Sequence, residues 1–350
     1  MKKTFLFKVL ALIAVLCSLT CVFIACENSP KTSECAHSVE ILSGKEATCT
    51  EEGLTAGEKC AICGEILVAQ KVIIPLEHEY VEGNCVTCGV TSTEYFNFTL
   101  GYDGAYGVEV NESKKADLPV NVKIPSTYNG LPVTLISREA FFVCESLESV
   151  IIPETITKIS TMAFCGCDAL TSITIPDSVT VISDFAFDGC DKLEKVIISE
   201  NSQLTFIGFR AFKFCASLTT ISIPDGITYV GESAFAECPR LKYNEKDYLR
   251  YLGNEGNRYL YLVGATTKEI TTANIDYHCK VIGYNAFEKC VNLTSVLIRS
   301  GVVFVGRNAF SNCGIFNIYC EAESKPLAWH DEWNSGNLPV IWGYDTQSNG

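Results

Sequence analysis

The sequence predicts a repeat solenoid of the β-rich α/β class, preceded by a small cysteine-rich module and an export signal. An Ala-Phe pair that is followed three residues later by Cys recurs seven times, and most of these phenylalanines are 23 residues apart. A short alternation of apolar and polar residues precedes each pair, as expected for a strand. The recurring phenylalanines are Phe141, Phe164, Phe187, Phe212, Phe235, Phe287 and Phe310.

Residues 170–190 show what one unit should form. The run 172–175 (Ser-Ile-Thr-Ile) alternates polar and apolar residues, which is typical of a strand with one buried face. Pro176 ends the strand, because proline cannot donate to a strand ladder. The Ala-Phe-x-x-Cys run 186–190 has the spacing of one helical turn on the far side of the unit. Because one unit cannot bury its own edges, the units should stack, with the repeated cysteines as buried, reduced thiols.

One interval between successive phenylalanines is 52 residues long and contains a degenerate unit and an insertion. The degenerate unit keeps the apolar phase of the others at Ile270, Ala273, Ile275, Cys279 and Ile282. The insertion, residues 239–269, is expected to be a hairpin around the polar loop 253–258. Its tyrosines are a candidate binding surface, because tyrosine is enriched at protein interfaces. They are Tyr248, Tyr251, Tyr259 and Tyr261.

The repeated pattern L-x-x-I-x-I-P…V-x-x-I…A-F-x-x-C spans about residues 124–343 and resembles the BspA-like leucine-rich repeat family of bacterial surface proteins. The resemblance implies a leucine-rich repeat solenoid over residues 93–322 and a C-terminal cap and tail over 323–350. It also implies adhesion to a protein partner on host or neighbouring cells.

The N-terminus predicts export. Residues 1–25 combine early lysines with a long uncharged apolar run, as in a secretory signal peptide. The sequence Phe-Ile-Ala-Cys that ends at Cys26 resembles a bacterial lipobox, in which the cysteine thiol is lipidated. Residues 26–34 would then be a lipid-anchored tether, and the membrane would be contacted through the lipid only. An uncleaved membrane anchor is the alternative, and both place the chain outside the cytoplasm, at the bacterial cell surface.

Residues 35–92 carry two C-x-x-C-G motifs, a spacing typical of zinc ribbons. The predicted ligands of this structural zinc are Cys60, Cys63, Cys85 and Cys88. Alternative ligands are His37, Cys49, His78 and Cys35. The segment also resembles short cysteine-rich modules of secreted proteins from anaerobic gut bacteria. A disulfide-stapled module is the alternative, since export favours oxidation.

The net charge and the motifs of the sequence exclude some classes of function. The formal charge of −14 argues against a nucleic-acid partner. The chain has neither G-x-S-x-G nor H-E-x-x-H, so we expect no enzyme activity. The leading hypothesis is protein recognition by the outward strand residues, with an envelope scaffold as the alternative and a metal-dependent hydrolase as a remote one. The candidate strand residues are Ser172, Thr174, Lys195, Thr220 and Ser222.

Overall fold

The computed structural model describes residues 38–46, 53–73, 80–81, 84–85 and 95–345. The chain divides into two compact units, one ending at Ile74 and one that contains all of residues 75–350. The signal region and Cys26 lie outside the described residues. In the described part of the chain, no helix is long and apolar enough to span a membrane.

Unit 1 consists of short antiparallel strands with little buried surface. The strands β1 (Val39–Leu42), β3 (Gly57–Cys60) and β4 (Ile66–Val68) form one sheet, and β2 (Gly53–Leu54) pairs with β5 (Val72–Ile73). The outer strands β1 and β4 are almost wholly exposed, whereas Cys60 is buried. Small domains with so little buried surface are commonly stabilised by disulfides or a metal ion.

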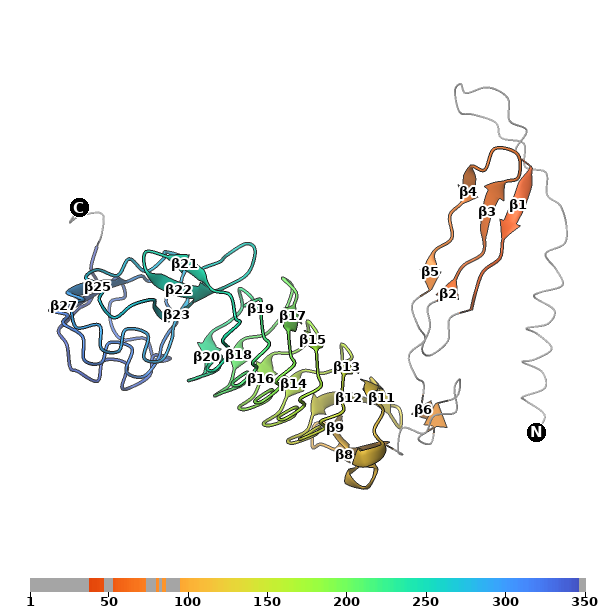
Figure 1. Ribbon diagram of the computed structural model, residues 1–350, viewed down its shortest axis with the longest axis horizontal. Coiled ribbons are helices and arrows are strands. Elements are labelled where there is room, and N and C mark those ends of the chain that lie inside the picture. The colour runs from red at the N-terminus through yellow and green to blue at the C-terminus, as the bar shows by residue number, and fades with distance from the viewer. Residues whose placement is uncertain (1–37, 47–52, 74–79, 82–83, 86–94, 346–350) are drawn as a thin grey trace. The chain divides into compact units, whose positions relative to one another are not determined.

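Unit 2 is a β-solenoid in which short parallel strands follow one another at the interval of the sequence repeat (Figure 1). It is preceded by a hairpin of β6 (Tyr80–Val81) and β7 (Asn84–Cys85). Two rows of strands run along it. The first row starts with the antiparallel pair β8–β9 and continues in parallel, in the order β8 (Phe96–Leu100), β9 (Tyr106–Val110), β12 (Leu131–Ile136), β14 (Lys158–Ile159), β16 (Val181–Ile182), β18 (Phe206–Ile207) and β20 (Tyr229–Val230). The 3-10 helix η1 (Glu112–Asp117) follows β9, and β11 (Thr127–Tyr128) pairs with β12.

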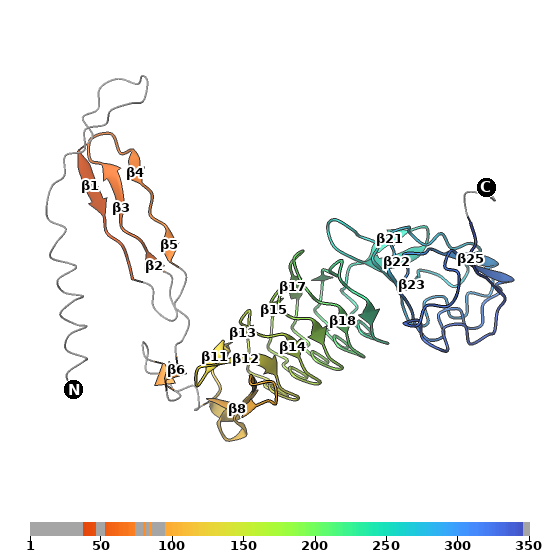
Figure 2. The ribbon, with the colours of Figure 1, turned by 180° about the vertical axis from the view of Figure 1, so that it is seen from behind.

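The second row contains the strands predicted from the alternating runs. Here β10 (Asn121–Lys123) pairs with β13 (Ser149–Ile151), and β15 (Ser172–Ile175), β17 (Lys195–Ile198) and β19 (Thr220–Ile221) form a parallel sheet. Figure 2 shows β13, β15 and β17 in succession along this row. The alternation is as expected: Ile173 and Ile175 are buried, and Ser172 and Thr174 are exposed.

The insertion interrupts both rows and starts a second stack. Its strands β21 (Asn244–Lys246), β22 (Leu249–Leu252) and β23 (Tyr261–Ala265) are antiparallel, and β23 then pairs in parallel with β24 (Val281–Ile282) and, through it, β26 (Phe304–Val305). The second row resumes as β25 (Ser295–Ile298), β27 (Asn317–Cys320) and β28 (Val340–Ile341). The degenerate unit is confirmed, because all five of its predicted core residues are buried.

The core is a column of aromatic rings beside a column of thiols. Consecutive repeat phenylalanines stack with their ring centroids 4.9–5.6 Å apart within each stack, and their planes are within 12° of parallel. Five repeat cysteines donate their thiol to the carbonyl of the phenylalanine in the preceding unit, for example Cys190 Sγ to Phe164 O at 3.1 Å. The cysteines of the solenoid, from Cys144 to Cys320, form no disulfide. At these five positions the thiol makes a hydrogen bond that alanine could not make.

The predicted helical turn is wrong. Each Ala-Phe-x-x-Cys segment, together with the residue before it, is a succession of tight turns in which two residues adopt positive φ, such as Phe185 at 58° and Gly189 at 74°. Alternate amides donate within the segment, and the others donate to the next segment of the stack. Phe164 N, for example, donates to Ala186 O at 2.7 Å. The stack, rather than a helix, satisfies the backbone.

Candidate functional site

The strand face, defined here as the outward side chains of β13, β15, β17 and β19, is a small-residue surface with two exposed isoleucines. In register, Ser172 lies beside Lys195 and Thr174 lies beside Ile197. Ile151 is 60% exposed and Ile197 is 46% exposed. Lys195 is the single charged side chain on these four strands. Of the predicted strand residues, Ser172, Thr174, Lys195 and Thr220 are exposed, and Ser222, just after β19, is half-buried.

The tyrosines of the insertion do not form one exposed surface. Tyr248 is exposed and Tyr259 is half-buried, but Tyr251 and Tyr261 are buried in the core. The hydroxyl of Tyr251 accepts a hydrogen bond from Asp276 N at 3.2 Å. Tyr261 lies next to the end of the first phenylalanine column, 6.3 Å from Phe235. The expectation of a tyrosine-rich docking surface therefore needs correction: Tyr251 holds the insertion against the second stack.

A buried carboxylate, which the sequence did not single out, connects the insertion to the degenerate unit. Asp276 accepts hydrogen bonds from Lys246 Nζ at 2.7 Å and from His278 N at 2.9 Å. Burial alone would raise the pKa of Asp276, but these donors hold it below its ordinary value. The group is thus an ionised structural tie between β21 and the degenerate unit.

The turns that carry Ala-Phe-x-x-Cys form a second hydrogen-bond ladder along the solenoid. In every turn of the first stack up to the one that contains Phe212, three alternate amides donate to three alternate carbonyls of the next turn. In that last case the three donor–acceptor distances are 2.8–3.1 Å, and the pairs are Arg210 N to Glu232 O, Phe212 N to Ala234 O and Phe214 N to Ala236 O. The same three bonds join the two turns of the second stack. The turn 233–238 breaks this rule. In the described structure, the amides of Ser233, Phe235 and Glu237 donate no hydrogen bond.

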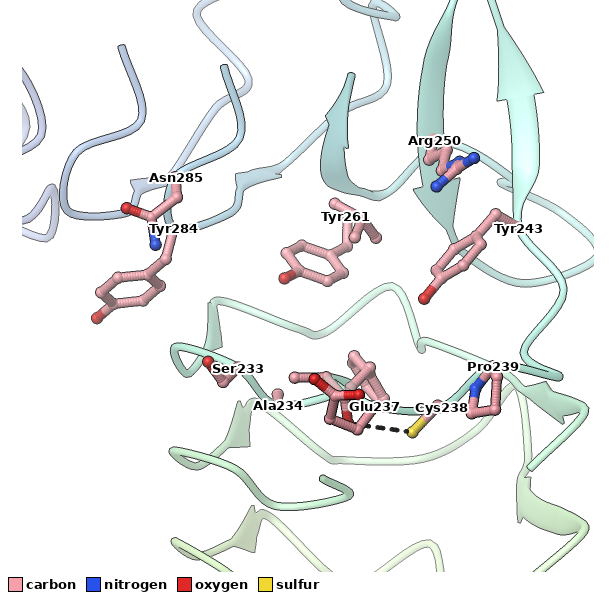
Figure 3. Close-up of a pocket in the computed structure, with 13 residues that line it drawn as sticks. Ser233, Ala234, Glu237, Cys238, Pro239, Tyr243, Arg250, Tyr261, Tyr284 and Asn285 are labelled. Atoms are coloured by element: carbon pink, nitrogen blue, oxygen red, sulfur yellow. Dashed lines mark hydrogen bonds between the residues drawn. The ribbon is translucent and has the colours of Figure 1, made fainter. Parts of the chain in front are cut away.

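The break has a simple cause in the sequence. The insertion supplies a strand, β23, to the second stack, where it pairs with β24, but residues 239–285 contain no Ala-Phe-x-x-Cys segment. The next turn of the stack is therefore missing, and only Ala265 N donates onward, to Ala286 O. The gap in the ladder is a cavity of about 530 Å³, lined on one side by residues 233–239 and on the other by Tyr243, Tyr261 and Tyr284. Figure 3 shows Tyr243 and Tyr261 above the turn, with space between. We call it the junction cavity.

Side chains hold the two stacks together around the junction cavity. The hydroxyls of Tyr229 and Tyr284 are 3.0 Å apart, and Arg307 Nη2 lies 3.0 Å from Glu232 Oε2. These contacts join the two stacks at the place where the backbone ladder is missing.

In unit 1, the first C-x-x-C-G motif forms a tight turn. Cys60 Sγ accepts from the amides of Ile62 and Cys63 at 3.4 and 3.5 Å, and Gly64 has φ 77°. A tight turn of this kind brings the two cysteines of a C-x-x-C motif together, as a zinc ribbon requires. Cys85 lies in β7, whose side chains are not described, and the remaining predicted ligands, Cys88, His37, Cys49, His78 and Cys35, lie outside the described residues. The zinc site stays a prediction.

The repeat is recognised by a known family model. The model for the BspA type leucine-rich repeat region matches six copies over residues 131–253 and 265–327, which together are more than half of the chain. The chain belongs to the BspA-type leucine-rich repeat family. The interruption of the BspA-type repeats, residues 254–264, falls in the insertion described above. No curated protein matches the chain significantly.

Several solved structures resemble this BspA-type chain. A leucine-rich repeat protein from Bacteroides ovatus is 23% identical, with 71% of this chain and 70% of that chain covered and a TM-score of 0.40. A leucine-rich repeat protein of T. pallidum is 21% identical, with 71% and 96% covered and a TM-score of 0.42. The pneumococcal vaccine antigen PcpA is 18% identical, with 71% and 75% covered and a TM-score of 0.39. At these identities the likeness does not extend to function.

Proposed function

We propose that this protein is a lipid-anchored protein-recognition module of the bacterial cell surface, which adheres to proteins of host or neighbouring cells through its solenoid. Cys26 carries the lipid in this proposal, and the cysteine-rich module, stabilised by zinc, separates the solenoid from the membrane. Solenoids of stacked repeats present extended surfaces of this kind to partners.

The observation that carries the proposal is the strand face. Its hydrophobic side chains Ile151 and Ile197 are exposed on two successive sheets of the second row, β10–β13 and β15–β17–β19. Ile151 pairs in register with Lys123, and Ile197 pairs with Thr174. Apolar side chains with few charged neighbours can be desolvated at little cost, as at the centres of protein interfaces. The chain's remaining acidic charge would act on the rate and specificity of association rather than on this contact.

The test is a binding experiment with matched variants. The purified chain with Cys26→Ser, which cannot be lipidated, is titrated against a panel of matrix glycoproteins and against intact cells. Ile151→Glu should weaken saturable binding about tenfold or more, because it replaces an apolar side chain by a charged one at the contact. Val291→Glu is the control, since Val291 is also β-branched and 60% exposed but lies outside the strand face.

Three outcomes decide the matter. Loss of binding with Ile151→Glu alone supports recognition by the strand face. Equal loss, or no loss, with both variants means that another surface binds. Absence of binding to the whole panel, together with resistance of the protein to protease on intact cells, favours an envelope scaffold instead.

A further inference from the structure

We propose that the junction cavity is a peptide-binding site, which takes a short extended segment of a partner protein through its backbone carbonyls. This inference rests on the proposed function, because it gives the protein-recognition module a second, more specific contact.

The amides of Ser233, Phe235 and Glu237 have no acceptor in the described structure. The equivalent amides of the earlier turns in the first stack, and of the first turn in the second stack, all donate to the following turn. Phe235 is buried, whereas Ser233 and Glu237 are exposed. Buried backbone donors are nearly always paired in proteins, so the unpaired amide of Phe235 is the one that most needs an acceptor from a partner. All three residues line the junction cavity.

The other turns of the solenoid indicate which acceptor these amides would bind. At every other junction between turns of a stack, the acceptors are carbonyls of alternate residues, such as Glu232, Ala234 and Ala236. An extended peptide presents the carbonyls of alternate residues on one edge. Addition of a peptide to an unpaired backbone edge is a known mode of recognition, in which main-chain bonds give affinity and side-chain pockets give specificity.

The volume and the charges of the junction cavity limit what it can bind. The volume of about 530 Å³ falls in the range of about 300–1,000 Å³ that is usual for ligand sites. The tyrosine rings of Tyr243 and Tyr261 form the opposite wall, which suits aliphatic or aromatic side chains. The exposed Glu237 has no ion-pair partner within the described structure, and Arg250 is held by Glu245 at 3.2 Å. The site is therefore suited to an uncharged or basic peptide rather than to an anion.

The experiment uses random dodecapeptides displayed on phage, selected on the full-length protein and then synthesised. The affinity of each selected peptide is measured by fluorescence anisotropy. An ester in place of the amide at residue 235, introduced as the α-hydroxy analogue of phenylalanine, removes one donor without changing the side chain. The ester also makes the Ala234 carbonyl a weaker acceptor for Phe212 N. The ester at Phe310 has the same effect on the bond from Phe287 N to Ala309 O, so a control at that position carries the same structural cost. We expect uncharged or basic peptides and a threefold to tenfold weaker binding to the ester, about the effect of one hydrogen bond.

The matched control is the same ester at Phe310, whose amide belongs to the last turn and likewise donates no hydrogen bond in the described structure. It should bind the peptides as the unmodified protein does. A second variant, Ala236→Trp, fills the cavity from a half-buried position whose equivalent in the first turn is Phe142. It should abolish peptide binding, whereas Ser311→Trp at the equivalent position of the last turn should not.

The proposal is overturned if no peptide is enriched, if the selected peptides bind both esters equally, or if they tolerate Ala236→Trp. The two proposals fail separately. Suppose that a partner protein binds the chain and loses affinity with Ile151→Glu, but no peptide binds at residue 235. The proposed function is then supported, and the peptide site in the junction cavity is refuted.

Discussion

Replacement of Phe187 by alanine tests the physical basis of the solenoid. The Phe187 side chain has no solvent exposure, and its ring lies between Phe164 and Phe212, with both centroid distances at 5.1 Å. Loss of a buried phenylalanine ring costs about 3–5 kcal/mol, because both the transfer free energy and a cavity term are lost. Two stacked ring contacts, each worth about 0.5–1.5 kcal/mol, place the expected loss in the upper part of that range.

The assay is urea denaturation followed by circular dichroism, with the slope of the transition compared between variants. Phe187→Ala should lower the free energy of unfolding by about 4–5 kcal/mol, a large share of the ~5–15 kcal/mol typical of a domain. Phe316→Ala is the control, because Phe316 is 72% exposed, and it should change stability by less than about 0.5 kcal/mol. A loss below about 1 kcal/mol for Phe187→Ala would refute the continuous aromatic column.

The buried thiols of the solenoid, the carboxylate of Asp276 and the cysteine-rich module can each be tested in solution. Burial raises the pKa of Cys144 and Cys313 to about 11. Iodoacetamide at pH 8 should therefore modify these thiols slowly in the native chain and quickly in urea. Rapid modification of the native chain would contradict the buried column of thiols. Asp276 has a pKa below its unfolded value of about 3.9, so its contribution to stability is present above pH 4 and is lost as the pH falls through the folded pKa. Asp276→Asn should therefore reduce the loss of stability between pH 5 and pH 3. If the free energy of unfolding falls as steeply over this pH range in the variant as in the unmodified protein, Asp276 does not stabilise the fold as an ionised group. Native mass spectrometry should find about one zinc per chain, lost with Cys60→Ser or Cys63→Ser, whereas a metal-free chain with no thiols in that module would favour disulfides.

The repeat core could be predicted from the sequence because its signal is carried by side chains at a fixed period. The alternation in residues 172–175 and the phase of Ile270 and Cys279 each determined which residues are buried, even where the unit is degenerate. The turns could not be predicted in the same way. Phe185 and Arg210 adopt positive φ, which their residue types disfavour, and only the ladder between neighbouring turns compensates that cost.

The candidate sites were predicted less well. Tyr251 and Tyr261 were expected at the surface from their residue type, but β22 and β23 turn them into the core of the solenoid. The junction cavity has no side-chain signature, because its donors are backbone amides. Its one signal in the sequence is the 52-residue interval between Phe235 and Phe287, which is long enough for another Ala-Phe-x-x-Cys segment and contains none.

Residue-resolved hydrogen exchange of the unliganded protein tests the central claim, an interrupted ladder inside an otherwise continuous solenoid. The amides of Phe187, Phe212 and Phe287, which donate to the next turn, should exchange slowly. The amide of Phe235, which occupies the same position in its turn, should exchange orders of magnitude faster. Equal protection of Phe235 and Phe212 would contradict the account, because it would mean that the chain itself closes the junction.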